Sequence, residues 1–561
     1  MMKRNECFAD LLVSAFPSDQ DKRKARTSKC MVFGETDSVN IRVGVFFDGT
    51  GNNKFNTEAR LEYEKDNIKH GPLRNREAYI YQQRFNEEKS GLSTMGTLPL
   101  SDKLGLKLDK PVLVDDSYSN YYSNVAILFK HYDTPTTNDE SIGKVYVEGI
   151  GTKKYESDDS FDGKGRGTGK YGITTRVNEA CDMLAKEVKR LASVKTVFEL
   201  KIDVFGFSRG AAAARNFIHE ITLKEKDEVN LVLSQGAVKH YPKQYKHGAL
   251  GEALEKEGLQ FDGELEIVFA GLFDTVPSFY TSIKNYRGDK GAEDLNLNAI
   301  SKAKNVLHLT AMDERRKNFA LVDISSKGSK YEKALPGVHS DIGGGYNPKV
   351  PEAGKIIYEG FESAISREIQ SVIEQGWYAN KEQLKRHTKP INNKDDREKL
   401  EEMGLESLEY GYLEVVKKVV CNKYSFIPLH LMKMKGDEIR KGMFTDITEK
   451  AHEIPKNEEV LNYTYKRLQE YVIENKGGPM KFYTEEELGL DDIVTVSKDP
   501  IYRQKLDDHY YLKELRQKYF HTSHDLRKMH KNSLHPNWDT MFFYPFKPSI
   551  NDKPSREIIR G

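Results

Sequence analysis

The stretch TVFELKIDVFGFSRGAAAAR, residues 196–215, joins a run of β-branched and aromatic residues to an alanine-rich run through the pattern Gly-x-Ser-x-Gly. The first run predicts a strand over 196–205, and the second predicts a helix from Ala211 to about Thr222. The pattern alone arises by chance in long chains, but a strand that enters it and a helix that leaves it form the setting of a nucleophile elbow. Ser208 is therefore the candidate nucleophile. The alternative is a serine in an ordinary turn between a strand and a helix.

The segments around this stretch predict an α/β fold. Buried strands are predicted over 41–47, 144–147 and 265–272, and helices over 123–129 and 173–191. Strands that alternate with helices indicate a mostly parallel sheet with helices on both faces. Ligands of such sheets bind at the carboxyl ends of the strands, so we look for the chemistry in the loops that follow them.

The residues beside Ser208 fit a site that stabilises an oxyanion. Gly206 and Gly210 leave out side chains that would collide with the neighbouring strand and helix. The N-terminus of the following helix directs N–H groups and the positive end of its dipole toward the place where an oxyanion would form. We expect one donor to be the backbone N–H of Arg209. The other is expected from Gly49 or Thr50, in the loop after the first strand, whose alternative role is a purely structural turn.

A serine hydroxyl needs a histidine base, and the base needs a carboxylate that orients it. Asp274 follows a predicted strand and is the candidate carboxylate, although it can instead cap the turn that follows. His339 lies between a Pro-Gly turn and a triple glycine, on a sharply shaped loop, and is the leading candidate for the base. Its rivals are the histidines near the C-terminal end, His521, His524, His530 and His535.

Other polar residues are secondary candidates. Asp48, after the first strand, and Asp341, close to His339, could orient the base or hold an ion, and His521 could carry the base or, with Asp525, a metal. The glycine-rich loop 163–170 (GKGRGTGK) lacks the spacing of a phosphate-binding loop and has no strand directly before it. We therefore interpret this loop as a flexible lid beside the active site.

Composition excludes several classes of protein. Lys and Arg number 87 against 86 Asp and Glu, and the sequence has no basic stripe, so a nucleic-acid partner is not expected. The longest apolar runs are far shorter than a membrane-spanning helix, and Glu6 and Asp10 interrupt what would be the core of a signal peptide. Four scattered cysteines are typical of a chain that folds in a reducing cytosol.

The domain organisation is expected to centre on one catalytic core. Residues 1–38 are polar and predict an N-terminal arm or docking segment. The core is expected over 39–350, with a charged insertion at about 54–120. Residues 351–500 are helical and charged in character and predict a cap or lid, and residues 501–561 are expected to pack back on the core.

Five motifs in order resemble a bacterial α/β-hydrolase family whose members include phospholipase effectors delivered by type VI secretion systems. They are FFDGTGNN (46–53), GFSRGAAAAR (206–215), FDTV (273–276), the expected helix DERR (313–316) and PGVHSDIGGGY (336–346). The resemblance covers about residues 40–350. It implies that Ser208, Asp274 and His339 take the triad positions and that neither a metal nor an organic cofactor takes part in the chemical step.

The resemblance implies a phospholipase of the A type that uses an acyl-enzyme mechanism. The expected partners are a phospholipid membrane surface as substrate, a spike protein of the secretion apparatus and an immunity protein. Such a protein is made in the bacterial cytoplasm without a signal peptide and delivered to the periplasm of a target cell. The alternatives are a soluble carboxylesterase or lipase with no toxin role, and a non-catalytic interaction protein that keeps the hydrolase fold.

Overall fold

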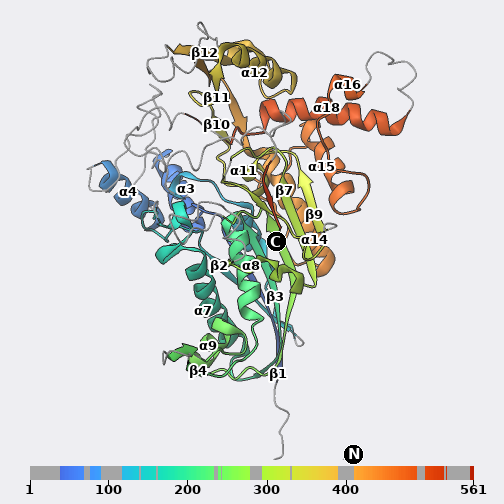
Figure 1. The fold of residues 1–561 in the computed structure, drawn as a ribbon. Helices are drawn as coiled ribbons and strands as arrows, with labels where there is room; N and C mark the ends of the chain where they lie inside the picture. The colour runs from blue at the N-terminus through green and yellow to red at the C-terminus, as the bar shows by residue number, and fades with distance from the viewer. Residues whose placement is uncertain are drawn as a thin grey trace, which may run out of the picture.

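The structure is a computed structural model, and it describes residues 38–68, 76–89, 117–137, 140–159, 162–232, 238–241, 243–277, 294–316, 318–328, 331–389, 410–488, 499–523, 526 and 556–560. Its centre is a six-stranded sheet of order β2-β1-β3-β6-β7-β9 (Figure 1). The strands are β1 (Ser38–Phe47), β2 (Glu140–Val147), β3 (Thr196–Phe207), β6 (Glu264–Phe273), β7 (Asn305–Ala311) and β9 (Glu332–Leu335). Every neighbouring pair is parallel. The expected α/β class, with a mostly parallel sheet between helices, is confirmed.

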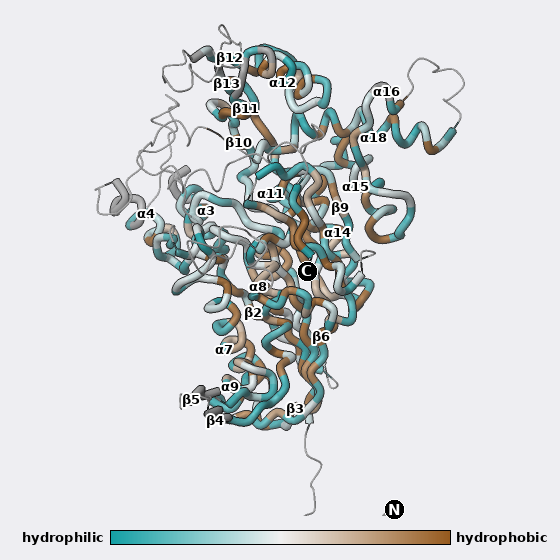
Figure 2. The backbone as a smooth tube through the Cα atoms, in the orientation of Figure 1, coloured by the Kyte–Doolittle hydropathy of each residue, from teal (hydrophilic) through white to brown (hydrophobic). Residues whose placement is uncertain are grey.

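Helices cover both faces of this sheet. One face contacts α7 (Ile173–Ala192) and α8 (Arg209–Ile221), against which α9 (Gly248–Lys256) packs, and the other contacts α6 (Asn124–His131) and α14 (Phe426–Ile439). Because successive side chains of a strand point to opposite faces, β1 sends Val43 and Val45 into the core on the α7 side and Phe46 into the core on the α6 side. The hydrophobic residues accordingly gather along the central strands and the inner sides of the helices (Figure 2).

The central strands also carry a buried ion pair. Arg42 of β1 donates from Nε and Nη2 to the two carboxylate oxygens of Asp203 in β3, at 2.7 and 2.8 Å. The hydroxyl of Tyr132 donates to the same carboxylate at 2.7 Å. These bonds compensate the cost of burying the two charges and fix β3 against its neighbour.

Two helices lie within the charged stretch 54–120. They are α3 (Lys54–Ile68) and α4 (Arg76–Lys89), and they contact each other. Their sequences alternate charged and aromatic residues without a clear apolar stripe, which is why helical periodicity did not predict them.

The region after residue 350 is not purely helical, and that expectation is wrong in part. An antiparallel sheet of order β11-β13-β12 is formed by β11 (Ile356–Phe361), β13 (Tyr410–Val415) and β12 (Leu384–Lys389), and β10 (Lys349–Pro351) pairs with β14 (Val419–Cys421). The helices of the region are α12 (Glu362–Glu374), α14, α15 (Glu459–Val472), α16 (Glu485–Leu488) and α18 (Pro500–Lys518). The strand β12, LKRHTK, carries so many charged residues that its sequence hides its extended conformation.

The expected helix at 313–316 is absent. This segment is a loop after β7, and the carboxylate of Glu314 accepts the N–H groups of Arg315 and Arg316 at 2.9 and 2.8 Å. A side chain that bonds its own neighbouring backbone competes with helical hydrogen bonding.

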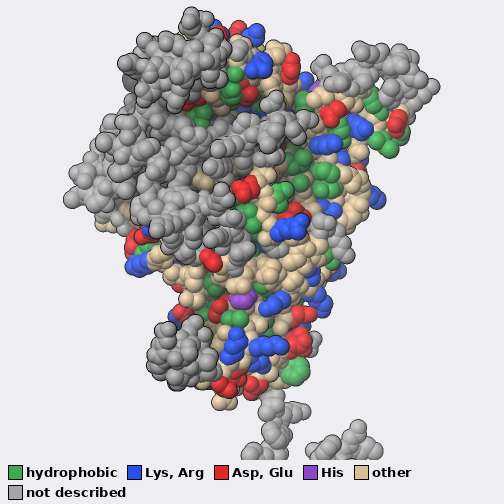
Figure 3. Space-filling view, in the orientation of Figure 1, with side chains coloured by type: hydrophobic (Ala, Val, Ile, Leu, Met, Phe, Trp, Pro, Cys, Tyr) green, Lys and Arg blue, Asp and Glu red, His purple; other side chains and the backbone are tan. Residues whose placement is uncertain are grey.

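A short strand near the C-terminal end joins the core. β15 (Ile558–Ile559) pairs in parallel with β8 (Leu321–Val322), which follows the Glu314 loop. Figure 3 shows positive and negative side chains interspersed over the described part of one face, as the near-zero net charge predicts. No helix among the described residues is long and apolar enough to cross a membrane.

Candidate active site

Ser208 stands at the corner between β3 and α8. Its backbone has φ 59° and ψ −129°, a conformation that a residue with a side chain rarely adopts. The neighbouring strand β6 holds the corner in place, because the N–H of Ser208 donates to the carbonyl of Phe273 at 3.0 Å. Backbone strain of this kind persists only where the surrounding structure enforces it, and it is a mark of functional sites.

The two glycines of the Gly-x-Ser-x-Gly pattern allow the close packing that the corner needs. A Cβ atom at Gly206 would lie 2.6 Å from the backbone of Ala211, and one at Gly210 would lie 2.2 Å from the carbonyl oxygen of Asp48. Both approaches are shorter than real Cβ contacts. The pattern thus reflects the collision with neighbouring strand and helix that the sequence predicted.

Asp274 lies directly beside this corner. It follows the last residue of β6 and has a positive φ of 45°. Its N–H donates to the carbonyl of Leu309 at 2.8 Å, and the N–H of Val276, two residues on, donates to the carbonyl of Ser208 at 3.4 Å. The loop after β6 is therefore bonded both to β7 and to the nucleophile corner.

His339 pairs with Asp274. The distance from its Nδ1 to Oδ2 of Asp274 is 2.5 Å. The imidazole begins the short helix α11 (His339–Gly343) after β9, and it packs between the rings of Phe207 at 4.7 Å and Phe319 at 5.0 Å between centroids. Phe207 precedes Ser208, so the histidine is brought to the nucleophile corner from the far edge of the sheet.

The Nε2 atom of His339 and the hydroxyl of Ser208 are both without a hydrogen-bond partner among the residues that the structure describes. Each of the two residues is nearly buried, with 4% exposure. Since Asp274 occupies Nδ1, Nε2 is the nitrogen left to accept a proton. The imidazole can therefore accept a proton from a hydroxyl that reaches Nε2.

Burial and charge set the protonation states of the pair. Burial alone would raise the pKa of Asp274, but the Arg556 guanidinium and His339 lower it well below its usual range, so the carboxylate is ionised. Burial lowers the pKa of His339 below its ordinary 6.5, although Asp274 acts in the opposite direction. At neutral pH the imidazole is uncharged, as a base must be.

Sequence reasoning missed two charged residues at this site. Glu314 is fully buried and accepts the N–H of His339 at 3.3 Å, while its partner Arg316 lies over the ring of Phe319 at 3.3 Å. Arg556 contacts the carboxylate of Asp274. Glu314 could have been noticed within the DERR motif. Nothing in the sequence near the C-terminal end distinguishes Arg556 from the other arginines there.

The expected oxyanion donors differ in availability. The N–H of Gly49 already donates to the Asp48 carboxylate at 2.7 Å, so it is occupied within its own loop. Thr50 donates no backbone hydrogen bond to any other described residue, and its hydroxyl accepts from the side chain of Arg209 at 2.8 Å. Arg209 is the first residue of α8, so its N–H lies at the positive end of the helix dipole. Thr50 and Arg209 thus remain the candidates.

Asp48 organises the loop after β1 and contacts none of the histidines that the structure describes. Its oxygens accept from the hydroxyls of Ser123 and Tyr146, each at 2.5 Å, as well as from Gly49. Burial raises the pKa of Asp48, and these donors act against that rise. Its position supports a role in shaping the loop that holds Thr50, rather than in orienting the base.

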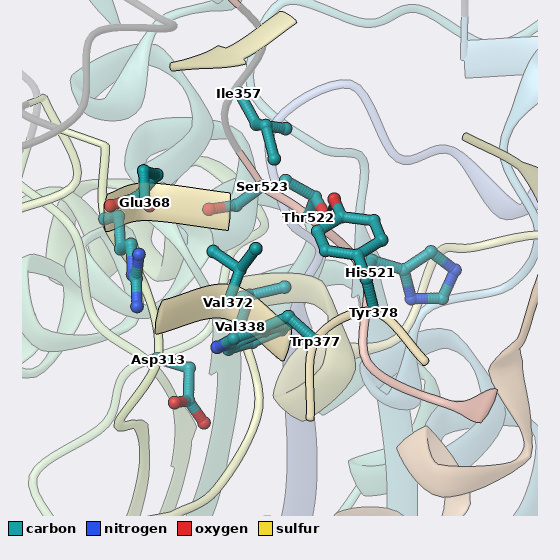
Figure 4. A pocket seen from close by; sticks show the side chains of 11 residues that line it. Asp313, Val338, Ile357, Glu368, Val372, Trp377, Tyr378, His521, Thr522 and Ser523 are labelled. Atoms are coloured by element: carbon teal, nitrogen blue, oxygen red, sulfur yellow. Dashed lines mark hydrogen bonds between the residues drawn. The ribbon is translucent and has the colours of Figure 1, made fainter. Parts of the chain in front are cut away.

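Asp341 and His521 form a second, separate pair. The Nδ1 atom of His521 lies 2.7 Å from Oδ1 of Asp341, and the ring of Tyr346 stacks on the imidazole at 3.6 Å. His521 lines a cavity together with Val338, Trp377 and Ser523 (Figure 4). The buried polar atoms of these last residues, Nε1 of Trp377 and Oγ of Ser523, and Nε2 of His521 have no hydrogen-bond partner among the described residues.

The lining of that cavity does not include Ser208 or Asp274. His521 is therefore paired away from the nucleophile corner, and His339 is the histidine that the structure brings beside it. The other rivals, His524, His530 and His535, lie outside the described residues, as does Asp525.

The glycine-rich loop packs beside the corner. The side chain of Arg209 donates to the carbonyls of Gly163 and Lys164 and thereby links this loop to the residue after the nucleophile. Lys164 itself forms an ion pair with Asp158 at 2.5 Å. The loop lies where the sequence placed a lid, next to Thr50 and Arg209.

The segment that carries these residues resembles a known family. Residues 113–364, which include Ser208, Asp274 and His339, match the model of a family described as the catalytic domain of Tle1-like phospholipase effectors of the type VI secretion system. The match begins after the FFDGTGNN motif, so it covers a shorter range than the resemblance seen in the sequence. No curated protein matches the chain.

Among solved structures, the Tle1 effector bound to the VgrG spike from the type VI secretion system is 22% identical to this chain. The alignment covers 93% of this chain and 94% of that one, with a TM-score of 0.51. This likeness shows the fold. An uncharacterised protein from Pseudomonas aeruginosa is 15% identical over 95% of this chain and 67% of that one, with a TM-score of 0.30.

Proposed function

We propose that this chain is a serine hydrolase that cleaves acyl esters of membrane phospholipids, with Ser208 as nucleophile, His339 as base and Asp274 as the carboxylate that orients the base. The proposal depends above all on the 2.5 Å contact between His339 and Asp274 next to the strained corner of Ser208. The match of residues 113–364 to a family of phospholipase effector catalytic domains supports the substrate class.

The reaction proceeds in two halves. The Ser208 oxygen attacks the acyl carbonyl carbon while Nε2 of His339 takes the hydroxyl proton, and the N–H groups of Arg209 and Thr50 receive the developing oxyanion. The imidazolium then protonates the oxygen of the departing lysophospholipid. Water, deprotonated by His339, attacks the acyl-serine ester and releases the fatty acid. Asp274 stabilises the imidazolium in both halves without taking its proton.

We propose further that the protein acts as a toxin delivered by a type VI secretion system. It would be made in the bacterial cytoplasm, carried by a spike protein and released into the periplasm of a target cell, and an immunity protein would protect its producer. The support for the spike as a partner is the fold shared with an effector solved in complex with VgrG.

The first test compares the unmodified protein with Ser208→Ala on phospholipid vesicles, with fatty acid and lysophospholipid release as the readout. We expect the substitution to lower turnover by about 10⁴- to 10⁶-fold, because the nucleophile and base act as a unit. Ser371→Ala serves as the matched control and should leave the rate unchanged, because Ser371 is a half-buried residue of α12 whose hydroxyl accepts from the side chain of Gln375.

Two outcomes would overturn or narrow the proposal. If Ser208→Ala keeps the vesicle activity of the unmodified chain, Ser208 is not the nucleophile. If the protein hydrolyses short-chain soluble esters in a Ser208-dependent way but leaves vesicles intact, the soluble carboxylesterase alternative replaces the phospholipase.

A further inference from the structure

A charged residue from the C-terminal part of the chain reaches the carboxylate of the proposed triad. Arg556 donates from Nη1 to Oδ1 of Asp274 at 2.6 Å and from Nη2 to Oδ2 at 2.8 Å. This is a bidentate pair between a planar guanidinium and a carboxylate, the geometry that gives such pairs both strength and direction. The remaining nitrogen, Nε, donates to the carbonyl of Phe319 at 2.7 Å.

The strand β15 fixes the backbone of the segment that carries Arg556. The N–H of Leu321 donates to the carbonyl of Glu557, and the N–H of Asp323 donates to the carbonyl of Ile559, each at 2.9 Å. On its other side β8 is tied to the site, since the N–H of Val322 donates to the carbonyl of Thr275, next to Asp274, at 3.0 Å. One small strand pair thus connects Arg556 to the loop that carries the carboxylate.

With Arg556 in place, the carboxylate of Asp274 has no freedom to turn. Oδ1 accepts from Arg556 and from the N–H of Ala311 at 2.9 Å, and Oδ2 accepts from Arg556 and contacts His339. Four contacts use the available directions around a carboxylate. Any rotation that served another partner would break the bond to His339.

We propose that Arg556 is a positioning residue of the active site, which fixes the orientation of Asp274 and through it the orientation of His339. This inference rests on the proposed function, because it assigns a role in the same triad. It also means that the segment 556–560, which begins about 190 residues beyond the range that matches the catalytic-domain family, supplies part of the active site.

A purely structural role for Arg556 would have different consequences. If the residue only anchored β15, its loss would lower the melting temperature and change nothing else. The guanidinium that is bound to Asp274 also offsets part of the negative charge that this carboxylate presents to the imidazole of His339. Besides Asp274 and Arg556, the charged groups facing His339 are Glu314 and Arg316, which form an ion pair with each other. Removing Arg556 should therefore favour the imidazolium and move the acidic limb of the kcat/KM profile to higher pH.

The test uses the full chain with Arg556→Ala and Arg556→Lys, and Arg560→Ala, an exposed residue of the same segment, as the matched control. Turnover of a soluble ester is measured across pH, together with the melting temperature and with labelling of Ser208 by a fluorophosphonate. We expect Arg556→Ala to lower kcat by about 10- to 100-fold, the range seen when a partner of an active-site ligand is lost. Arg556→Lys should keep an intermediate rate, and Arg560→Ala should match the unmodified protein.

Chemical rescue makes the result decisive. Guanidinium ion at millimolar concentration should restore part of the activity of Arg556→Ala and none of that of Ser208→Ala. If both Arg556 variants keep the kcat and the acidic limb of the unmodified protein, or lose activity only in step with melting temperature and without rescue, the positioning role is wrong. Should the unmodified protein itself show no Ser208-dependent activity, the proposed function fails instead, and the two failures are thereby distinguished.

Discussion

Two buried histidines each pair with an aspartate, and the short helix α11 contributes one residue to each pair, yet only one pair adjoins a strained serine. His339 and Asp341 are both residues of α11, but Asp341 turns to His521 while His339 turns to Asp274. An imidazole held by a carboxylate is common in protein interiors and is not by itself catalytic. At the scale of the residue, the free nitrogen beside the Ser208 corner is what supports assigning the base to His339.

Replacing each histidine should separate these roles. His339→Ala should lower kcat by about 10⁴-fold or more, because it removes the proposed base. His521→Ala should retain most of the rate but lower the free energy of unfolding by about 1–3 kcal/mol, since it removes the imidazole that pairs with Oδ1 of the buried Asp341. Ester turnover and urea unfolding measure the two effects. Full activity in His339→Ala together with an inactive, stably folded His521→Ala would reverse the assignment.

The pH dependence follows from the lowered pKa of His339. The base works when neutral, and burial keeps its pKa below 6.5, so the midpoint of the acidic limb of kcat/KM should lie below pH 6.5. In the unfolded chain the same imidazole takes up a proton near its ordinary pKa of about 6.5. This histidine therefore contributes a loss of stability as the pH falls below that value.

A kcat/KM profile with a soluble ester checks this expectation. An acidic limb centred clearly above pH 6.5 would mean that Asp274 stabilises the imidazolium more than burial opposes it.

At the scale of the element, the site is built from the ends of four parallel strands. The loop after β1 brings Thr50, the corner after β3 brings Ser208, and the turn after β6 brings Asp274, whereas His339 enters after β9. Because parallel strands end at one edge of the sheet, residues far apart in the chain meet there. One close joint in this assembly is the contact of α8 with the end of β1, since Gly210 lies against the backbone of Asp48.

Gly210→Ala tests that joint. The added Cβ would lie 2.2 Å from a backbone carbonyl, so the helix or the loop must move. We expect a loss of about 1–3 kcal/mol in the free energy of unfolding, together with a lower kcat, because the shift displaces the residue after the nucleophile. Gly478→Ala, where no atom lies within 4 Å of the added methyl, is the control and should change neither quantity. Unchanged stability and turnover in Gly210→Ala would show that the helix and the loop accommodate the added methyl group without a shift that matters to the site.

At the scale of the whole molecule, the sequence predicted the elements whose signals are local. The strand 196–205 and the helix 173–191 correspond to β3 and α7, because β-branched runs and an apolar stripe survive in the sequence of each. The small sheet after residue 350 was missed, since charged residues cover strands such as β12. The helix expected at 313–316 does not form, for another reason. The carboxylate of Glu314 accepts hydrogen bonds from the backbone N–H groups of Arg315 and His339.

The candidate site divides in the same way. Asp274 and His339 could be named from motifs and strand ends, and the structure brings them into contact. The occupied N–H of Gly49 could not be foreseen, because it depends on a side-chain rotamer of Asp48. Arg556 could not be foreseen either, because a two-residue strand pair sets its position and such pairing leaves no periodic trace in a sequence.

The location of Arg556 bears on how a cell could make such a protein safely. Chains emerge from the ribosome with the N-terminal part first, and the earlier parts begin to fold during synthesis. Ser208, Asp274 and His339 would leave the exit tunnel long before the segment 556–560 could join β8. Under the positioning role proposed for Arg556, a nascent or prematurely terminated polypeptide carries a weakened lipolytic centre, and full hydrolytic power develops only after translation has passed this arginine.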